Sequence, residues 1–160
     1  MQFEIRTYMP GDVAHIIERH RALYLAEYDL GGTFADYVDR YMRAFESDNN
    51  PAREKLWVLE CQGRFAGSIA IVDAGEGSAQ LRWFLVEPDM RGRGAGTALV
   101  EEALAFCRRA GYTRVFLWTL SILDSALYIY KKQGFILTQE TFNNEWREGL
   151  TEECYELVLN

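Results

Sequence analysis

The sequence has few cysteines, and the three present, Cys61, Cys107 and Cys154, lie far apart along its 160 residues. An odd number of widely spaced cysteines provides neither a zinc knuckle nor a disulfide framework. Long hydrophobic runs are missing as well, since those present are strand-sized, as over residues 83–86, and cannot span a bilayer. The start of the sequence has no basic-then-apolar signal pattern. We therefore expect a cytoplasmic protein with reduced thiols, no metal and no membrane partner.

Positive charge is also scarce, because 17 lysines and arginines stand against 24 acidic residues and leave a formal net charge of −7. Binding nucleic acid without regard to its sequence needs a basic face, so we expect no nucleic-acid partner. The acidic balance either steers cationic amines toward the protein or only keeps it soluble. Apolar residues are abundant, with 49% hydrophobic and 14% aromatic. This composition and length predict a single packed domain over residues 1–160.

Hydrophobic periodicity predicts an α/β protein with a mixed sheet, in the order β-α-α-β-β-β-α-β-α-β-β. Asp12 and Thr33 are expected to cap the first two helices, which the glycines at 31–32 separate. The other predicted elements are strands near Phe3 and over 56–61, 65–72, 80–86, 115–118, 135–141 and 154–159, with helices after residue 96 and over 122–133. The strands at 80–86 and 115–118 should pair in parallel, because a helix connects them.

The most informative segment follows the predicted strand at 80–86 and is rich in arginine and glycine. Gly92, Gly94 and Gly96 allow sharp turns and a close approach of the backbone to a ligand. The first turn of the next helix offers N–H groups and the positive end of a dipole to an anion. Arg91 and Arg93 add guanidinium groups that suit phosphate oxygens. The segment predicts a phosphate-binding loop, and the alternative is a plain glycine-rich turn with two solvated arginines.

Two nucleotide-binding motifs do not match this loop. The nucleotide-triphosphate loop ends in Gly-Lys-Ser/Thr, and no lysine follows Gly96. The dinucleotide fingerprint requires a third glycine where this sequence has Thr97. The remaining pattern, Arg91-x-x-Gly94-x-Gly96, resembles the coenzyme-A-binding signature of the GNAT family of N-acetyltransferases. Residues 126–135, ALYIYKKQGF, resemble that family's A-x-x-x-Y-x-K-x-G-F segment and follow at the family's spacing.

The resemblance extends over the whole chain and implies the GNAT fold, acetyl-CoA as cofactor and acetyl transfer to an amine. The phrases WFLVEP and LVEEALAF are similar to the acetyltransferase half of bacterial fusions with MarR-type regulators, but we carry over no DNA-binding role. The acceptor is expected to be a small-molecule amine or an exposed amino group, and a homodimer is among the assemblies implied. The residues implied to hold the coenzyme are Leu85, Val86, Arg91, Gly92, Arg93, Gly94, Ala95, Gly96, Thr97 and Tyr130.

For catalysis, the resemblance implies that Tyr130 donates a proton to the departing thiolate, because a phenol keeps its proton at pH 7. Tyr130 also lies on an apolar helical stripe, so a buried core tyrosine is the alternative. The resemblance does not supply the base. Many members have an asparagine where this sequence has Leu123 and a glutamate where it has Trp118. The missing carboxylate leaves a second interpretation open, a catalytically weak acyl-CoA-binding sensor.

The first helix offers candidates for the base and for contacts with the acceptor. His20, Tyr24 and Glu27 continue the apolar stripe of residues 13–17 at steps of three and four. Ionisable groups on such a face are costly unless they are paired or face a cavity. We therefore hypothesise that Glu27 or His20 binds or deprotonates the amine, and the alternative is a helix end that reaches solvent.

Two other groups are expected near the acceptor. Arg82 points away from its strand neighbours and, if it faces inward, can hold a substrate carboxylate. Residues 143–146 lie in the loop between the last two strands, which is a second expected pocket edge.

Overall fold

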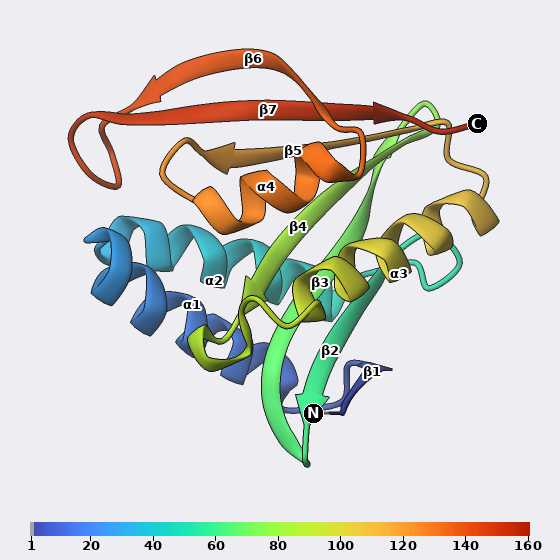
Figure 1. Cartoon of the computed structure of the whole chain (residues 1–160), viewed down its shortest axis with the longest axis horizontal. Coiled ribbons are helices and arrows are strands. Elements are labelled where there is room, and N and C mark those ends of the chain that lie inside the picture. Colours follow the sequence, from blue (N-terminus) through green and yellow to red (C-terminus); the bar gives the residue numbers. More distant parts are fainter. Residues whose placement is uncertain (1) are drawn as a thin grey trace.

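The computed structural model describes residues 2–160 and contains a single mixed sheet with helices on both faces (Figure 1). The order of strands and helices and the α/β class are as predicted. In chain order the elements are β1 (Phe3–Thr7), α1 (Asp12–Tyr28), α2 (Gly32–Ser47), β2 (Lys55–Cys61), β3 (Arg64–Gly75), β4 (Ser78–Val86), a 3₁₀ turn (Pro88–Met90), α3 (Ala95–Arg109), β5 (Arg114–Leu120), α4 (Asp124–Lys132), β6 (Ile136–Asn143) and β7 (Leu150–Val158).

The seven strands lie in the order β1-β2-β3-β4-β5-β7-β6. β4 and β5 pair in parallel, as predicted, and the other neighbours are antiparallel. Within the described residues, the β4–β5 pairing is limited to Ser78–Arg114, Ala79–Val115 and Gln80–Phe116. β4 continues to Val86 and β5 to Leu120, so the two strands splay apart beyond the third pair (Figure 1).

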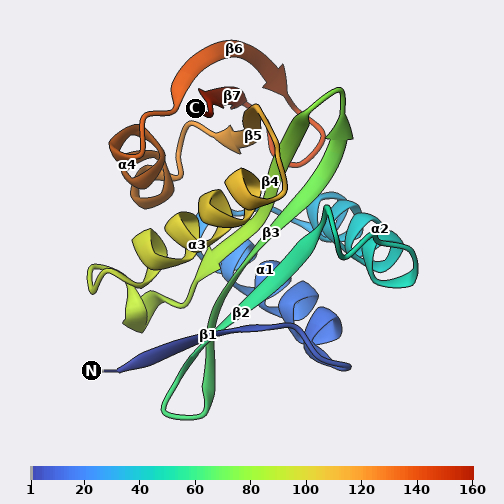
Figure 2. The same cartoon turned by 90° about the vertical axis from the view of Figure 1, so that its right-hand side faces the viewer.

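The two faces of the sheet carry two separate hydrophobic clusters. One joins α3 and α4 to side chains such as Trp57 and Leu59, and the other joins α1 and α2 to Leu56 and Val58. Successive residues of a strand point to opposite faces, so β2 contributes to both clusters. Figure 2 shows α3 on one side of the strands and α1 and α2 on the other. A fully buried leucine of this kind contributes about 1.5–3 kcal/mol to folding.

The helix starts differ from the prediction at two polar residues. The residue that caps α1 is Gly11, not Asp12, whose carboxylate instead pairs with Arg6 at 2.8 Å. α2 is likewise preceded by a glycine, while the hydroxyl of Thr33 donates to the carbonyl of Glu145 at 2.8 Å. Both capping predictions were wrong, because the Asp12 carboxylate accepts from Arg6 and from the Met9 N–H that precede α1, and the Thr33 hydroxyl bonds to a distant carbonyl.

Several elements have other limits than those predicted. β7 begins at Leu150 instead of residue 154, and β5 reaches Leu120 instead of residue 118. The cause is cross-strand pairing, which joins Leu120 to Glu152 and so includes the polar residues 151–153 in the strand. α4 begins at Asp124, two residues later than expected.

A bulge marks the end of β4. Ser68 pairs with Leu85 and Ala70 with Arg82, so two residues of β4 lie opposite one residue of β3. Trp83 has a left-handed backbone, with φ 51°, and its carbonyl accepts the buried Ser68 hydroxyl at 2.8 Å. Since a bulge bends its strand and increases the local twist, it helps to direct the end of β4 away from β5.

Candidate active site

The arginine- and glycine-rich loop connects the splayed end of β4 to α3. Gly92 and Gly94 have φ values of 77° and 84°, a conformation that strains any residue with a Cβ. Gly94 is the N-cap of α3, and no side chain caps that helix in the described structure, so its first-turn N–H groups can bind an anion. A Cβ on Gly96 would lie 2.8 Å from Cδ1 of Ile129. Glycine at this position therefore lets α3 pack closely on α4.

A cavity of about 530 Å³, here called the loop cavity, lies against this loop. Its walls come from α1, the end of β4, the loop and α4. Most of the residues predicted to hold the coenzyme are in the lining, while Arg93, Ala95 and Tyr130 are not. Those in the lining are Leu85, Val86, Arg91, Gly92, Gly94, Gly96 and Thr97.

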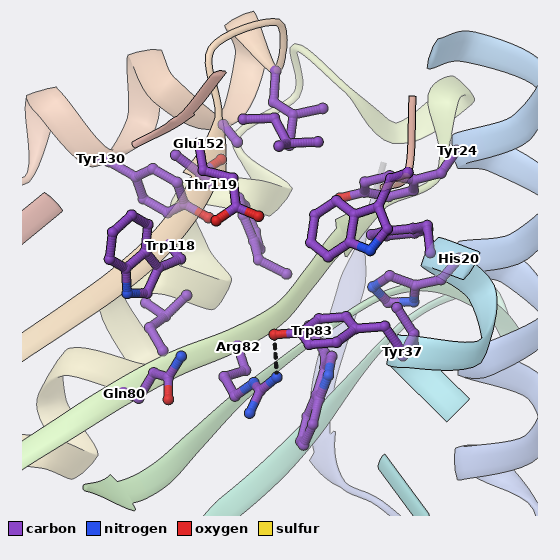
Figure 3. Close-up of a pocket in the computed structure, with 18 residues that line it drawn as sticks. His20, Tyr24, Tyr37, Gln80, Arg82, Trp83, Trp118, Thr119, Tyr130 and Glu152 are labelled. Carbon is purple, nitrogen blue, oxygen red and sulfur yellow. Dashed lines mark hydrogen bonds between the residues drawn. The ribbon is translucent and has the colours of Figure 1, made fainter. Parts of the chain in front are cut away.

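A second cavity of about 250 Å³, here called the aromatic cavity, lies where β4 and β5 have separated (Figure 3). Polar groups in its lining include those of His20, Gln80, Arg82, Thr119, Tyr130 and Glu152. Six of its aromatic rings are those of Tyr24, Phe34, Tyr37, Trp83, Trp118 and Trp146. The two cavities adjoin, because both are lined by Tyr24, Phe84, Leu123 and Ala126.

His20 lies in the wall of the aromatic cavity with only 3% of its surface exposed. Its Nδ1 lies 2.9 Å from the carbonyl oxygen of Ile16. Burial lowers the pKa of His20 to about 4, so the ring is neutral at pH 7. A carbonyl can only accept a hydrogen bond, so Nδ1 carries the proton and Nε2 keeps its lone pair. The ring stacks on Tyr24, with centroids 5.6 Å apart.

Tyr130 is buried between Phe84 and Phe135, with each pair of ring centroids 5.8 Å apart. Burial raises the pKa of its hydroxyl, so the phenol is fully protonated at neutral pH. The hydroxyl has no hydrogen-bond partner among residues 2–160, and the side chain lines the aromatic cavity. Tyr130 therefore has a proton that is available to a ligand.

Glu27 lies elsewhere than the sequence led us to expect. Its carboxylate forms two short hydrogen bonds, of 2.6 and 2.8 Å, with the guanidinium of Arg91, whose Nε also donates to the Val86 carbonyl. Glu27 is seven residues after His20 on α1, which is about 10 Å along the helix axis. This distance places Glu27 beyond the aromatic cavity and beside the loop. Glu27 is in the lining of neither cavity, and the Arg91 guanidinium lowers its pKa, which weakens it as a base.

Arg82 does point into the aromatic cavity (Figure 3). Its Nη2 donates to the hydroxyl of Tyr37 at 2.9 Å, and its guanidinium lies 4.8 Å from the centre of the Tyr41 ring and 5.0 Å from that of Trp83. Within the described chain it forms no ion pair.

The loop between β6 and β7 is a pocket edge, as expected. Trp146 lines the aromatic cavity, and Asn143 and Glu145 line a third cavity of about 640 Å³, here called the outer cavity. The outer and aromatic cavities adjoin, because Tyr37, Trp146 and Glu152 line both.

Glu152 is the ionisable residue of this site that the sequence analysis missed. It lies on β7 between Leu120 of β5 and Thr141 of β6, and its Oε1 accepts a hydrogen bond of 2.6 Å from Asn143. Figure 3 shows it on the same side of the aromatic cavity as Thr119 and Tyr130. The predicted strand began two residues too late to include it, because the run Thr151-Glu152-Glu153 has no apolar residue.

Residues 2–160 contain no group of three or more His, Cys, Asp or Glu side chains that could hold a metal ion. No helix in the same range combines the length and the apolar character needed to cross a membrane. The three cysteines are buried free thiols, and none lines the loop, aromatic or outer cavity.

Comparison with known proteins identifies the family. The model of the acetyltransferase (GNAT) family matches residues 17–135, so the chain belongs to this family. An uncharacterized N-acetyltransferase of Schizosaccharomyces pombe is 28% identical over 122 residues, which are 76% of this chain and 75% of that protein. The human N-acetyltransferase 8B is 33% identical over 120 residues, 69% of this chain. That match spans 53% of the human protein's length.

Solved structures agree with the fold. A GNAT-family acetyltransferase from Staphylococcus aureus superposes with a TM-score of 0.82 at 17% identity, over 99% of this chain and 100% of that one. The yncA protein of Salmonella typhimurium, determined with its cofactor acetyl-CoA, has a TM-score of 0.80 at 18% identity and covers 99% and 94% of the two chains. Acetyl-CoA is the acyl donor of the family, and this chain is an acetyl-CoA-dependent N-acetyltransferase.

Proposed function

We propose that this enzyme transfers the acetyl group of acetyl-CoA directly to a primary amine of a small molecule. The observation that carries the proposal is the common wall of the loop cavity and the aromatic cavity, at the place where β4 and β5 separate. A donor held in the loop cavity and an acceptor held in the aromatic cavity would meet at Phe84 and Ala126.

The residues at the loop cavity suit coenzyme A. The uncapped N-terminus of α3 and the left-handed glycines Gly92 and Gly94 offer N–H groups to the pyrophosphate. Beyond Gln80, the edge of β4 that faces β5 has no strand partner in the described chain, so its backbone groups can pair with the pantetheine arm. When bound, the coenzyme supplies an acetyl group activated as a thioester.

Two protons must move during the transfer, and the aromatic cavity has a group for each. The carbon–nitrogen bond forms as the carbon–sulfur bond breaks, the attacking nitrogen loses a proton, and the departing sulfur gains one. The Glu152 carboxylate can take the proton from the amine, and the Tyr130 phenol can give one to the sulfur. The neutral His20 ring, with a lone pair on Nε2, is a second group that can accept the amine's proton.

The proposal covers residues 1–160 as one acetyltransferase domain acting in the cytoplasm. The single sheet supports the first part, and the buried free thiols are compatible with the second. The finer resemblance to the acetyltransferase half of MarR-type fusions depends on short phrases such as WFLVEP and LVEEALAF and adds nothing to the reaction.

Thiol release from acetyl-CoA across a panel of primary amines tests the function. We expect turnover with at least one amine and a fall in kcat of about 100-fold in Glu152→Gln, which is typical of a lost general base. The kcat of His20→Gln, assayed in parallel, measures how much the imidazole contributes to removing the amine's proton.

The matched control is Glu153→Gln, because Glu153 is the next residue of β7 and lines none of the three cavities. It should keep the parent kcat. Tight binding of acetyl-CoA without turnover on any amine would instead identify a coenzyme-binding sensor and would refute the proposed function.

A further inference from the structure

Arg82 has a permanent positive charge inside the aromatic cavity and no carboxylate beside it in the described chain. Several other arginines of the fold pair with a carboxylate, as Arg19 does with Glu87 and Arg114 with Glu156. Among residues 2–160, the hydrogen-bond partner of Arg82 is the hydroxyl of Tyr37. Arg82 is half-buried, and partial removal of a guanidinium from water without a counter-ion favours an anion brought by a ligand.

The geometry holds Arg82 ready for such an anion. The rings of Tyr41 and Trp83 lie 4.8 and 5.0 Å from its guanidinium, and the Tyr37 hydroxyl occupies one N–H at 2.9 Å. These contacts hold the planar group in place and leave its other N–H groups for two parallel bonds to a carboxylate.

The opposite charge lies elsewhere in the same cavity. Glu152 stands with Tyr130 and Thr119 on the side of β5 and β7, while Arg82 comes from β4 (Figure 3). No ion pair joins Glu152 to Arg82, so each can bind a separate group of one ligand. An amine near Glu152 would also lie near Tyr130, where the proposed transfer takes place.

We propose, building on the function above, that the acceptor is a small amino acid whose carboxylate binds Arg82 and whose amino group faces Glu152. The remaining walls indicate its side chain. Phe34, Val38, Leu81 and Leu120 are buried apolar residues of the lining. A cavity of about 250 Å³ holds one compact molecule and not a peptide. An aliphatic or aromatic side chain fits these walls.

The outer cavity provides the competing acceptor class. Asp36, Glu145 and Glu152 are acidic residues in its lining, against the single cation of Arg40. This surface would also attract a polyamine, which has no group for Arg82. We favour the amino acid because Arg82 lines the aromatic cavity, which adjoins the proposed donor site, and would repel a second positive charge there.

Pairs of acceptors that differ only in the carboxylate test the inference. Leucine is compared with 3-methylbutylamine, and phenylalanine with 2-phenylethylamine, by thiol release from acetyl-CoA. The parent enzyme should favour the amino acid of a pair in kcat/KM by roughly 100-fold. Arg82→Gln should bring that ratio close to 1, mainly by raising KM for the amino acid, and Arg82→Lys should restore part of it.

Arg43→Gln is the matched control, because Arg43 lies on the exposed face of α2, where it pairs with Asp39 and Glu46. In this variant, the ratio of kcat/KM for the amino acid to kcat/KM for the matching amine should equal that of the parent. Equal use of both members of each pair by the parent, or a preference for spermidine, would overturn the inference and leave the acetyltransferase function intact. If Arg82→Gln lowers kcat/KM equally for the amino acid and the matching amine, Arg82 has only a structural role. Failure with every acceptor would count against the function itself.

Discussion

At the scale of single residues, burial determines the chemical state of the groups in the aromatic cavity. His20 is neutral because solvent is excluded from its ring, and Tyr130 keeps its proton for the same reason. Glu27 is affected by a charge rather than by burial, since Arg91 stabilises its carboxylate. All three residues lie on helices, but at pH 7 the His20 ring is neutral, the Tyr130 phenol keeps its proton and Glu27 is an ion-paired carboxylate.

The state of His20 makes stability depend on pH. Its folded-state pKa is about 4, below the ordinary value of 6.5, so the unfolded chain binds a proton that the folded chain does not. The stabilisation is complete above pH 6.5 and is lost as the pH falls toward 4. The slope is about 1.4 kcal/mol per pH unit, with a total of about 3 kcal/mol. Urea unfolding at pH 7, 6 and 5 should show this slope in the parent and a flatter one in His20→Gln.

The other histidine, the exposed His15, supplies the control for that measurement. His15→Gln should keep the parent slope. If His15→Gln flattens the curve and His20→Gln does not, the assignment of the buried neutral ring to His20 is wrong.

The sequence located part of the cavity lining residue by residue. His20 and Tyr24 follow from helical spacing, Arg82 from strand alternation and Tyr130 from a family motif, and all four lie in the aromatic cavity. Glu152 could not be found this way, because its place beside the cavity depends on pairing with β5 and β6. Glu27 was predicted from the same helical spacing but lines neither cavity. The spacing predicts which face of the helix a residue is on, but not how far along the helix the cavity extends.

At the scale of elements, the bulge in β4 keeps a strained residue next to the aromatic cavity. A left-handed backbone costs a non-glycine residue roughly 1–2 kcal/mol, and Trp83 adopts it at φ 51°. Its carbonyl is held by the Ser68 hydroxyl, and a Cβ on Gly67 would lie only 2.5 Å from the Leu85 carbonyl oxygen. β3 thus supports the bent end of β4 by a hydrogen bond and by close backbone contact.

Removing that hydrogen bond should be costly. Ser68→Ala leaves the Trp83 carbonyl buried without its donor, so we expect a loss of about 1–3 kcal/mol in the free energy of unfolding. Ser47→Ala, at the exposed end of α2, should change it by less than about 0.5 kcal/mol. Urea titrations of the two variants make the comparison, and equal losses would show that the bulge does not depend on Ser68.

Elements rich in apolar residues were predicted well, and polar ones were not. The central strands and α3 alternate or repeat clearly, and they lie where expected. The start of β7 is a polar run that forms a strand because β5 and β6 bond to it on both sides. The bulge had no sequence signal that we recognised, since neither Ser68 nor Trp83 is unusual in a strand.

At the scale of the whole molecule, the sheet has two parts that meet at the three residue pairs between β4 and β5. The loop cavity lies across this junction, with Val86 of β4 on one wall and Ser125 and Ile129 at α4 on another. A bound coenzyme would therefore contact both parts and stabilise their arrangement.

Acetyl-CoA at 100 times its dissociation constant should add about 2.7 kcal/mol of stability, which raises Tm by roughly 5–10 °C for a chain of this size. Gly94→Glu should abolish the shift, because it places a strained anionic side chain at the N-terminus of α3. Gly111→Glu is matched to it, with φ +87° and open space just beyond the other end of α3, and should keep the shift. Differential scanning fluorimetry measures both, and a persistent shift in Gly94→Glu would contradict the assignment of the loop.

The common wall of the two cavities also has a consequence for the steady-state kinetics of the reaction. Tyr24, Phe84, Leu123 and Ala126 separate the cavities by no more than one layer of side chains, and no cysteine of the described chain lines either one. In the direct transfer proposed above, the protein does not store the acetyl group, so both reactants must be bound at the same time. Initial-velocity lines, measured at several fixed concentrations of one reactant, then intersect instead of running parallel.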